Sequence, residues 1–196
     1  AARFYDVKFA VPRSLHAVER NRALVGAVLG YKPRGEARYG IVAPPEAPEW
    51  APRSPYVVML HAASRASKRW ASAHWVELAN TMSARGYTAV FPGGTHAERE
   101  AAAALAREIP GAIAAPAMDL VQAAALLAHA DGVVGVDTGL THLAVALGVP
   151  TIGIYGATSP ALTGLHGGAR AVNVGEAGKP PSVGDVIAAI GLASGA

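Results

Sequence analysis

From residue 56 onward, short apolar runs alternate with segments of helical character, and this alternation limits what the 196-residue chain can fold into. The apolar runs predict strands at 56–60, 88–91, 112–114, 132–136, 151–155 and 171–174. Helices are expected between and after them, at 73–85, 96–107, 119–127, 138–147 and 182–190. Strands that alternate with helices favour parallel pairing through right-handed crossovers, and continuously apolar strands fit a sheet buried on both faces. The sequence therefore predicts an α/β fold with a doubly wound parallel sheet.

The chain before residue 56 has a different character. Residues 14–31 predict one helix, with Ser14 as its cap and Gly30 as its end. Residues 32–55 contain six of the fourteen prolines and read as an extended linker. The length allows one domain, or one domain with part of another.

Composition excludes several classes of protein. Without cysteine, a disulfide scaffold and a Cys-ligated metal site are impossible, and the seven histidines lack the spacing of metal ligands. No apolar run is long enough to span a membrane, and no nucleic-acid-binding motif is present. The net charge of +3 is concentrated in the first half of the chain. That half fits either an anionic partner or an ordinary solvated face.

In an open α/β sheet, ligands bind beyond the carboxyl ends of the strands, so the loops there are informative. The loop after 56–60 holds Ser64 and Lys68 among other hydroxyls and cations, which suit phosphate oxygens, although it lacks the P-loop pattern. After 88–91 come two glycines and then Glu98. Glu98 fits two roles equally well, as an acceptor for ribose hydroxyls or as a complement to the helix dipole.

The segment DTGLTHL at 137–143 carries the strongest signal. Asp137 leaves a buried strand, Thr138 is placed to cap the next helix, and His142 lies one turn further along the same face. A diphosphate bound at this helix terminus gains from free amides and from the dipole. The alternative is a capped helix whose histidine is satisfied within the fold.

Four stretches together resemble a known family. They are HAVERNRALVGAVLGY at 16–31, LHAASRASKRWASAHW at 60–75, FPGGTHAERE at 91–100 and DTGLTHLAVALGVPTIGIYGATSPALTG at 137–164. In these the chain resembles the lipopolysaccharide heptosyltransferases, in particular type I. These are GT-B glycosyltransferases that move heptose from ADP-heptose to Kdo on the lipid A core. The resemblance implies a Rossmann-like donor domain over 56–196, an interdomain linker at 32–55 and a remnant of the acceptor-side domain at 1–31.

The resemblance also assigns roles to single residues. Donor-binding positions are Ala63, Ser64, Lys68, Glu98, Met118, Asp137, Thr138, Gly139 and His142. Ala63 stands where a threonine is common, so only its backbone serves. Glu98 would hold the ribose and Met118 would line the adenine pocket. Lys68 and the helix terminus at 138–139 would stabilise charge on the departing ADP.

The expected reaction is inverting and independent of a metal or other cofactor. The carboxylate base of the family lies near the start of the acceptor domain, and Asp6 is no substitute for it, so no base is assigned in this chain, which is expected to be an N-terminally truncated form. The expected partners are ADP-heptose, Kdo-lipid A and the inner membrane, at its cytoplasmic face, with no nucleic acid. Three alternatives remain: a non-catalytic nucleotide-sugar-binding fragment, a type II enzyme acting on a later core sugar, and an NAD-dependent enzyme, which the lack of GxGxxG disfavours.

Overall fold

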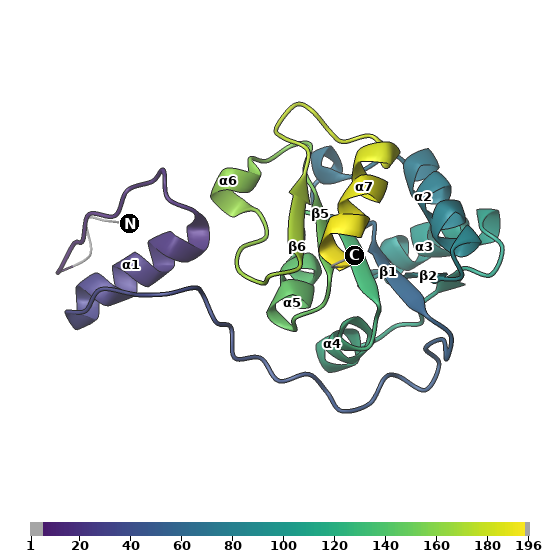
Figure 1. Cartoon of the computed structure of the whole chain (residues 1–196), viewed down its shortest axis with the longest axis horizontal. Coiled ribbons are helices and arrows are strands. Elements are labelled where there is room, and N and C mark those ends of the chain that lie inside the picture. Colours follow the sequence, from purple (N-terminus) through teal and green to yellow (C-terminus); the bar gives the residue numbers. More distant parts are fainter. Residues whose placement is uncertain (1–5, 195–196) are drawn as a thin grey trace.

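The computed structural model describes residues 6–194, and its centre is one parallel sheet of six strands (Figure 1). The strands are β1 (Tyr56–Leu60), β2 (Thr88–Phe91), β3 (Ile113–Ala114), β4 (Gly132–Val136), β5 (Thr151–Ile154) and β6 (Ala171–Val174). Their order across the sheet is β3-β2-β1-β4-β5-β6, and every pairing is parallel. The predicted doubly wound α/β fold is confirmed.

Helices cover both faces of the sheet because the strand residues alternate between two apolar cores. The helices are α2 (Ser72–Ala84), α3 (His96–Glu108), α4 (Leu120–Ala128), α5 (Gly139–Ala146) and α7 (Val183–Ser194). Val57 and Met59 belong to the core shared with α2, α3 and α7. Val58 and Leu60 belong to the core shared with α4 and α5. The central strands β1 and β4 therefore carry no polar side chain, as a sheet buried on both faces requires.

Two short elements were not predicted. A 3-10 turn, η2 (Ala66–Lys68), interrupts the loop after β1, and α6 (Pro160–Thr163) follows β5. The last helix also continues to Ser194, beyond its predicted end.

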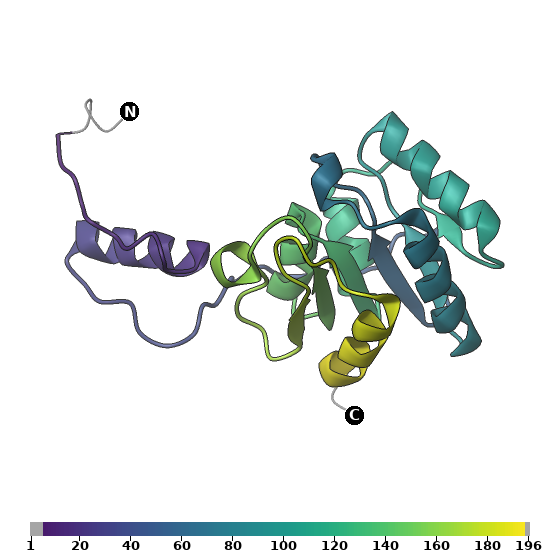
Figure 2. The same cartoon turned by 90° about the horizontal axis from the view of Figure 1, so that it is seen from above.

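The first helix stands apart from the α/β body (Figures 1 and 2). It is α1 (Ala17–Leu29), and it ends at Gly30 in the left-handed conformation, as predicted. The predicted cap was wrong: His16, not Ser14, caps the helix, and its Nδ1 accepts a hydrogen bond from the Val18 amide at 3.2 Å. The helix contacts the body at α6.

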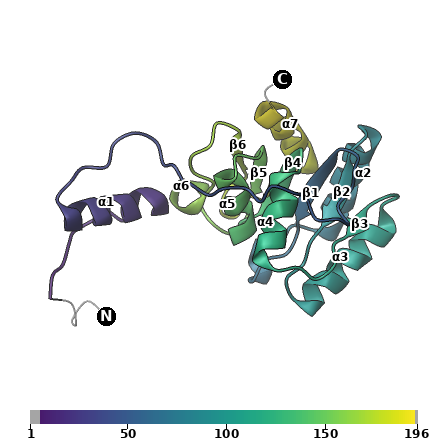
Figure 3. The ribbon, with the colours of Figure 1, turned by 90° about the horizontal axis from the view of Figure 1, so that it is seen from below.

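The proline-rich residues 32–55 contain no helix or strand, and they return from the far end of α1 to β1 (Figure 3). This path agrees with an extended connection, while the domain boundaries at 31 and 55 stay predictions. Over residues 6–194, no helix has both the length and the apolar character needed to cross a membrane.

The strand order places a topological switch point between β1 and β4. From β1 the chain proceeds outward to β2 and β3, then crosses back to β4 and continues outward on the other side. The loops that follow β1 and β4 therefore diverge at the carboxyl edge and leave a crevice, which is where ligands bind in such sheets.

Candidate functional site

An ion pair bridges the crevice between the loops that follow β1 and β4. Lys68 comes from η2 and Asp137 follows directly after β4. Lys68 Nζ lies 2.7 Å from Asp137 Oδ2 and 3.5 Å from the Asp137 carbonyl oxygen. The sequence separates these residues by 69 positions, so the fold alone brings them together.

Two further side chains hold the same carboxylate. Thr158 Oγ1 donates to Asp137 Oδ2 at 2.8 Å, and His142 Nε2 lies 3.5 Å from Asp137 Oδ1. The Asp137 side chain is only 9% exposed, whereas that of His142 is 41% exposed. The cluster thus has a buried anionic centre with a cation and an imidazole on its open side.

These contacts keep Asp137 ionised. Hydrogen bonding from His142 holds the pKa of Asp137 well below its usual range, and Lys68 and Thr158 lower it further against the opposing effect of burial. A carboxylate this acidic is a poor proton acceptor. Its charge instead fixes Lys68 and His142 at the mouth of the crevice.

The amino terminus of α5 lies beside this cluster and has no side-chain cap. Thr138 occupies the cap position in an extended conformation, but its hydroxyl makes no capping hydrogen bond, so the prediction that Thr138 caps this helix through its side chain was wrong. The next threonine, Thr141, is fully buried and donates to the Val136 carbonyl oxygen at 2.7 Å. The first amides of α5, from Gly139 on, are left for a ligand, and an anion is the ligand that such a terminus favours.

A cavity of about 260 Å³ adjoins this terminus. Its walls are mostly apolar, and Glu98, Met118 and Thr138 all line it. The structure thus gathers three of the predicted donor-binding residues around one space. Apolar walls with a few polar groups are typical of a small-molecule site.

Glu98 already has a structural task at the rim of this cavity. Its Oε2 accepts hydrogen bonds from the amides of Gly94 and Thr95, both at 2.9 Å, while Thr95 Oγ1 accepts from the Glu98 amide. This capping box starts α3. Hydrogen bonds from the Thr95 backbone are the main cause of a lowered pKa for Glu98. Glu98 therefore acts at the helix terminus in the structure, and its binding of ribose hydroxyls stays a prediction.

Ala63 and Ser64 lie elsewhere. Both line a second cavity, of about 580 Å³, on the α2 and α3 side of the loop after β1. Neither contacts the Lys68–Asp137 pair, and the hydroxyl that does join the cluster is that of Thr158, which was not predicted. The sequence prediction did not include Thr158, because it drew on the loops after β1, β2 and β4 alone. The loop after β5 also follows the carboxyl end of a strand, and that rule would have found it.

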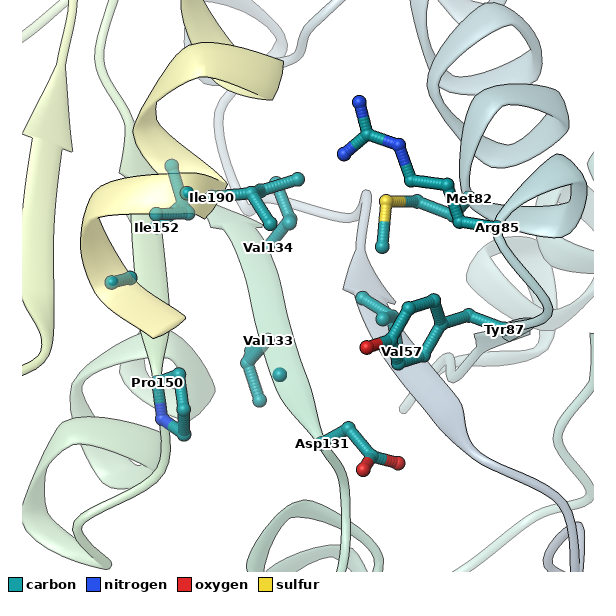
Figure 4. A pocket seen from close by; sticks show the side chains of 13 residues that line it. Val57, Met82, Arg85, Tyr87, Asp131, Val133, Val134, Pro150, Ile152 and Ile190 are labelled. Carbon is teal, nitrogen blue, oxygen red and sulfur yellow. The ribbon is translucent and has the colours of Figure 1, made fainter. Parts of the chain in front are cut away.

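A third hollow, of about 190 Å³, lies at the opposite edge of the sheet (Figure 4). Apolar side chains such as Val57 and Ile152 form its floor, with Arg85, Tyr87 and Asp131 around it. It contains none of the predicted site residues and lies away from the carboxyl ends of the strands. Over residues 6–194, no group of three or more His, Asp or Glu side chains is arranged to hold a metal ion.

Comparison with known proteins decides the family. A family model described as glycosyltransferase family 9 (heptosyltransferase) matches residues 1–185. The chain belongs to glycosyltransferase family 9. The resemblance inferred from the four sequence stretches is confirmed.

Individual relatives of this family 9 chain agree. It is 42% identical over 168 residues to lipopolysaccharide heptosyltransferase 1 of Pseudomonas aeruginosa, a match covering 85% of the chain and 47% of the relative. It is 39% identical over 174 residues to lipopolysaccharide heptosyltransferase 1 of Escherichia coli K12, covering 85% of the chain and 53% of the relative. The chain thus spans about half the length of these relatives.

The fold has a close match among solved structures. The E. coli heptosyltransferase WaaC with ADP superposes with a TM-score of 0.82 at 34% identity, covering 98% of this family 9 chain and 61% of that protein. The same enzyme with ADP-2-deoxy-2-fluoro heptose gives a TM-score of 0.72 at 33% identity, covering 94% and 56%. The architecture described above therefore matches the corresponding part of these heptosyltransferase structures.

Proposed function

We propose that this chain provides the ADP-heptose-binding half of a heptosyltransferase that transfers heptose to Kdo of the lipid A inner core. The observation that carries the proposal is the cluster of Lys68, Asp137 and His142 beside an uncapped helix terminus and an apolar cavity. Cation, amides and cavity suit a diphosphate joined to a nucleoside. Relatives named for heptosyltransferase 1 match 85% of the chain, whereas those named for heptosyltransferase 2 match 50%, which supports a type I enzyme.

In this proposal the donor is held along the carboxyl edge of the sheet. Adenine enters the cavity beside Met118, with its ribose toward Glu98. The diphosphate lies between Lys68 and the amides at Thr138 and Gly139. The heptose extends toward His142, whose side chain is the most exposed of the cluster. Asp137 does not act as the general base. Its charge keeps Lys68 and His142 in position.

The transfer step is a direct displacement without a metal. An acceptor hydroxyl oxygen of Kdo bonds to the anomeric carbon from the face opposite ADP, which inverts the configuration. The bond from that carbon to the β-phosphate oxygen breaks, and ADP leaves with the electron pair. Lys68 and the α5 amides stabilise the charge that grows on that oxygen. The hydroxyl proton passes to a general base, which is not assigned to any residue of this chain. The low pKa of Asp137 disfavours it for that task.

The reaction would take place at the cytoplasmic face of the inner membrane, where Kdo-lipid A is the acceptor. The excess of Lys and Arg in the first half of the sequence supports contact with an anionic lipid surface. A non-catalytic nucleotide-sugar-binding role is the second candidate, supported by the same cluster together with the lack of an assigned base.

Calorimetric titration with ADP tests the site. We expect the chain to bind ADP, and Lys68→Ala to weaken binding by roughly 10- to 100-fold, the range for losing a charge-assisted contact. Lys32→Ala is the matched control, because Lys32 is an exposed lysine in the linker. No heat of binding at millimolar ADP, or equal affinities for the two variants, would overturn the site assignment.

A further inference from the structure

The apolar cavity of about 260 Å³ beside the α5 terminus contains a carboxylate to which the proposed donor site gives no task. In that proposal the diphosphate lies toward Thr138, the ribose toward Glu98 and the base toward Met118. Asp119 and Leu120 follow Met118 directly in the chain, and both also line the cavity. The end of the cavity proposed for the base thus includes one carboxylate and one apolar side chain beyond Met118.

The start of α4 holds the Asp119 carboxylate in a defined position. Asp119 Oδ1 accepts a hydrogen bond from the Gln122 amide at 2.8 Å, and Gln122 Oε1 accepts one from the Asp119 amide at 2.9 Å. This capping box engages the backbone amide and one carboxylate oxygen of Asp119. Over residues 6–194, the second carboxylate oxygen, Oδ2, has no hydrogen-bond partner. Because Asp119 is exposed, Oδ2 is open to a ligand while Oδ1 keeps its place in the cap.

The chemistry of a carboxylate limits what Oδ2 can bind on adenine. An ionised carboxylate only accepts hydrogen bonds. The ring nitrogens of adenine left free in a nucleotide are acceptors too, and its one strong donor is the exocyclic amine. That amine is on the six-membered ring, whereas the ribose is joined to the five-membered ring. With the ribose toward Glu98, the amine therefore lies at the far end of the base, which is the end of the cavity that residues 118–120 line.

Leu120 offers an apolar surface for the base at the same end. It is 67% exposed although it lines the cavity, whereas Leu60, on the sheet side of the cavity, is 3% exposed. A flat base that lies against Leu120 covers this apolar surface, which favours binding. It also brings an edge of the base next to the neighbouring residue, Asp119.

We propose, resting on the proposed ADP-heptose function, that Asp119 determines the specificity of the donor site for adenine, because its Oδ2 accepts a hydrogen bond from the exocyclic amine. The other carboxylate that lines the cavity, Glu98, already directs its Oε2 to the amides of Gly94 and Thr95. Asp119 does not touch the reacting atoms, so its contribution is to donor selection. A purine that lacks the amine leaves Oδ2 without this bond.

Calorimetric titration of the chain with two ligands tests the proposal. One ligand is ADP, and the other is purine riboside 5′-diphosphate, in which a hydrogen atom replaces the amine and all other atoms are the same. We expect the parent chain to bind ADP about tenfold more tightly, near the low end for a hydrogen bond to a charged group, since Asp119 is exposed.

Asp119→Asn removes the acceptor and keeps the helix cap. Asparagine caps a helix as well as aspartate does, so its oxygen replaces Oδ1 and its amide nitrogen, which cannot accept, replaces Oδ2. We expect this variant to bind the two ligands with equal affinity. The loss of a negative charge near the diphosphate changes both affinities alike, so the ratio of the two affinities is the quantity that decides.

A matched control makes the same substitution at the start of another helix. Asp185 accepts a hydrogen bond from the Ser182 amide at the start of α7 and does not line the cavity, so Asp185→Asn is expected to keep the preference for ADP. If the parent chain binds neither ligand, the proposed donor site is wrong and this inference fails with it. If the parent chain binds both ligands equally, or if Asp119→Asn keeps the preference, the donor site stands but Asp119 does not select the base.

Discussion

Asp137 shows how one residue organises the proposed donor site. Its two carboxylate oxygens are shared among Lys68, Thr158 and His142, which come from three different parts of the chain. An anion buried to this degree needs such partners, because an unpaired buried charge is strongly destabilising. The same contacts align a cation and an imidazole toward the crevice. Structural and functional requirements therefore coincide at this position.

Thr158 is the least obvious partner of Asp137, and its removal gives a clear test. Thr158→Val keeps the shape of the side chain but leaves Asp137 Oδ2 without one hydrogen bond. We expect the free energy of unfolding to fall by about 1.5 kcal/mol, the low end of the range for a bond to a charged group, since the site is partly exposed. Urea denaturation of the parent chain and the variant measures this change in the free energy of unfolding.

Two further variants isolate the effect of that bond. Thr158→Ser retains a hydroxyl and is expected to recover most of the loss. Thr81→Val removes a hydroxyl that bonds within its own helix, to the Glu77 carbonyl oxygen, and is expected to change stability much less. If all three variants unfold at the same urea concentration, the Thr158–Asp137 bond contributes nothing to stability.

At the scale of elements, close packing of α5 on the sheet depends on a glycine in β4. A Cβ at Gly135 would collide with Thr141 Oγ1 and would lie 2.9 Å from Leu60 Cβ. Thr141 needs that space because its hydroxyl bonds the Val136 carbonyl oxygen at the end of the strand. The lack of a side chain at Gly135 lets α5 pack closely on β4. This packing fixes the position of the α5 terminus at which the diphosphate is proposed to bind.

Gly135→Ala is therefore expected to destabilise the chain by about 1–3 kcal/mol through overpacking. Gly191→Ala, in α7, is the matched control: a Cβ there meets nothing within 4 Å, and alanine favours a helix by about 0.5–1 kcal/mol. Thermal unfolding should move in opposite directions for the two variants. Equal shifts would show that glycine content rather than contact at Gly135 sets the effect.

Strands and long helices could be predicted from the sequence, and short or tertiary-dependent features could not. The limits of β1, β2 and β4 agree with their apolar runs because burial on both faces leaves little freedom in composition, and those of the half-buried edge strand β6 agree as well. The four-residue α6 and the turn η2 are too short to carry a periodic pattern. His16 replaced Ser14 as the cap of α1 because its ring also bonds Gly164, a contact made 148 residues away.

The candidate site was predictable to a similar degree. Lys68, Asp137 and His142 were found because strand carboxyl ends converge at a switch point. That rule does not predict which side of its loop a side chain faces. Ser64 lines the second cavity and is not part of the Lys68–Asp137 cluster. The indole Nε1 of Trp75, which is buried without a partner among residues 6–194, had no signal in the sequence, because the lack of a partner is a property of packing alone.

At the scale of the whole molecule, α1 is an arm held to the α/β body by a few polar contacts (Figures 1 and 2). The rings of His16 and His166 stack with centroids 4.4 Å apart. His16 Nε2 bonds the Gly164 carbonyl oxygen at 3.0 Å, and His166 Nε2 bonds Glu19 Oε1 at 3.0 Å. Much of the apolar surface of α1, including Leu29 at 69% exposure, contacts nothing in the body. Docking of the arm therefore depends on His16, which makes two of these contacts.

The geometry requires His16 to be neutral. Its Nδ1 accepts from the Val18 amide while Nε2 donates to Gly164, so a proton on Nδ1 would remove the cap of α1 and place a charge against the stacked ring of His166. Burial is the main cause of a lowered pKa for His16. The charges of His166 and His142 act in the same direction, and Glu19 and the Gly164 carbonyl oppose them. Release of α1 from the body is therefore coupled to protonation of His16.

We therefore expect docking of α1 to be strongest above pH 6.5, the ordinary pKa of histidine, and to weaken as the pH falls through the lower pKa of docked His16. Resonance titration of the Val18 amide and of the His16 ring should report one common midpoint below 6.5. His16→Asn is the matched control, because an asparagine oxygen caps a helix without titrating. In that variant the Val18 amide should be insensitive to pH over the same range. A Val18 amide in the parent chain that does not respond down to pH 5, or an equal response in His16→Asn, would show that docking of the arm does not depend on His16.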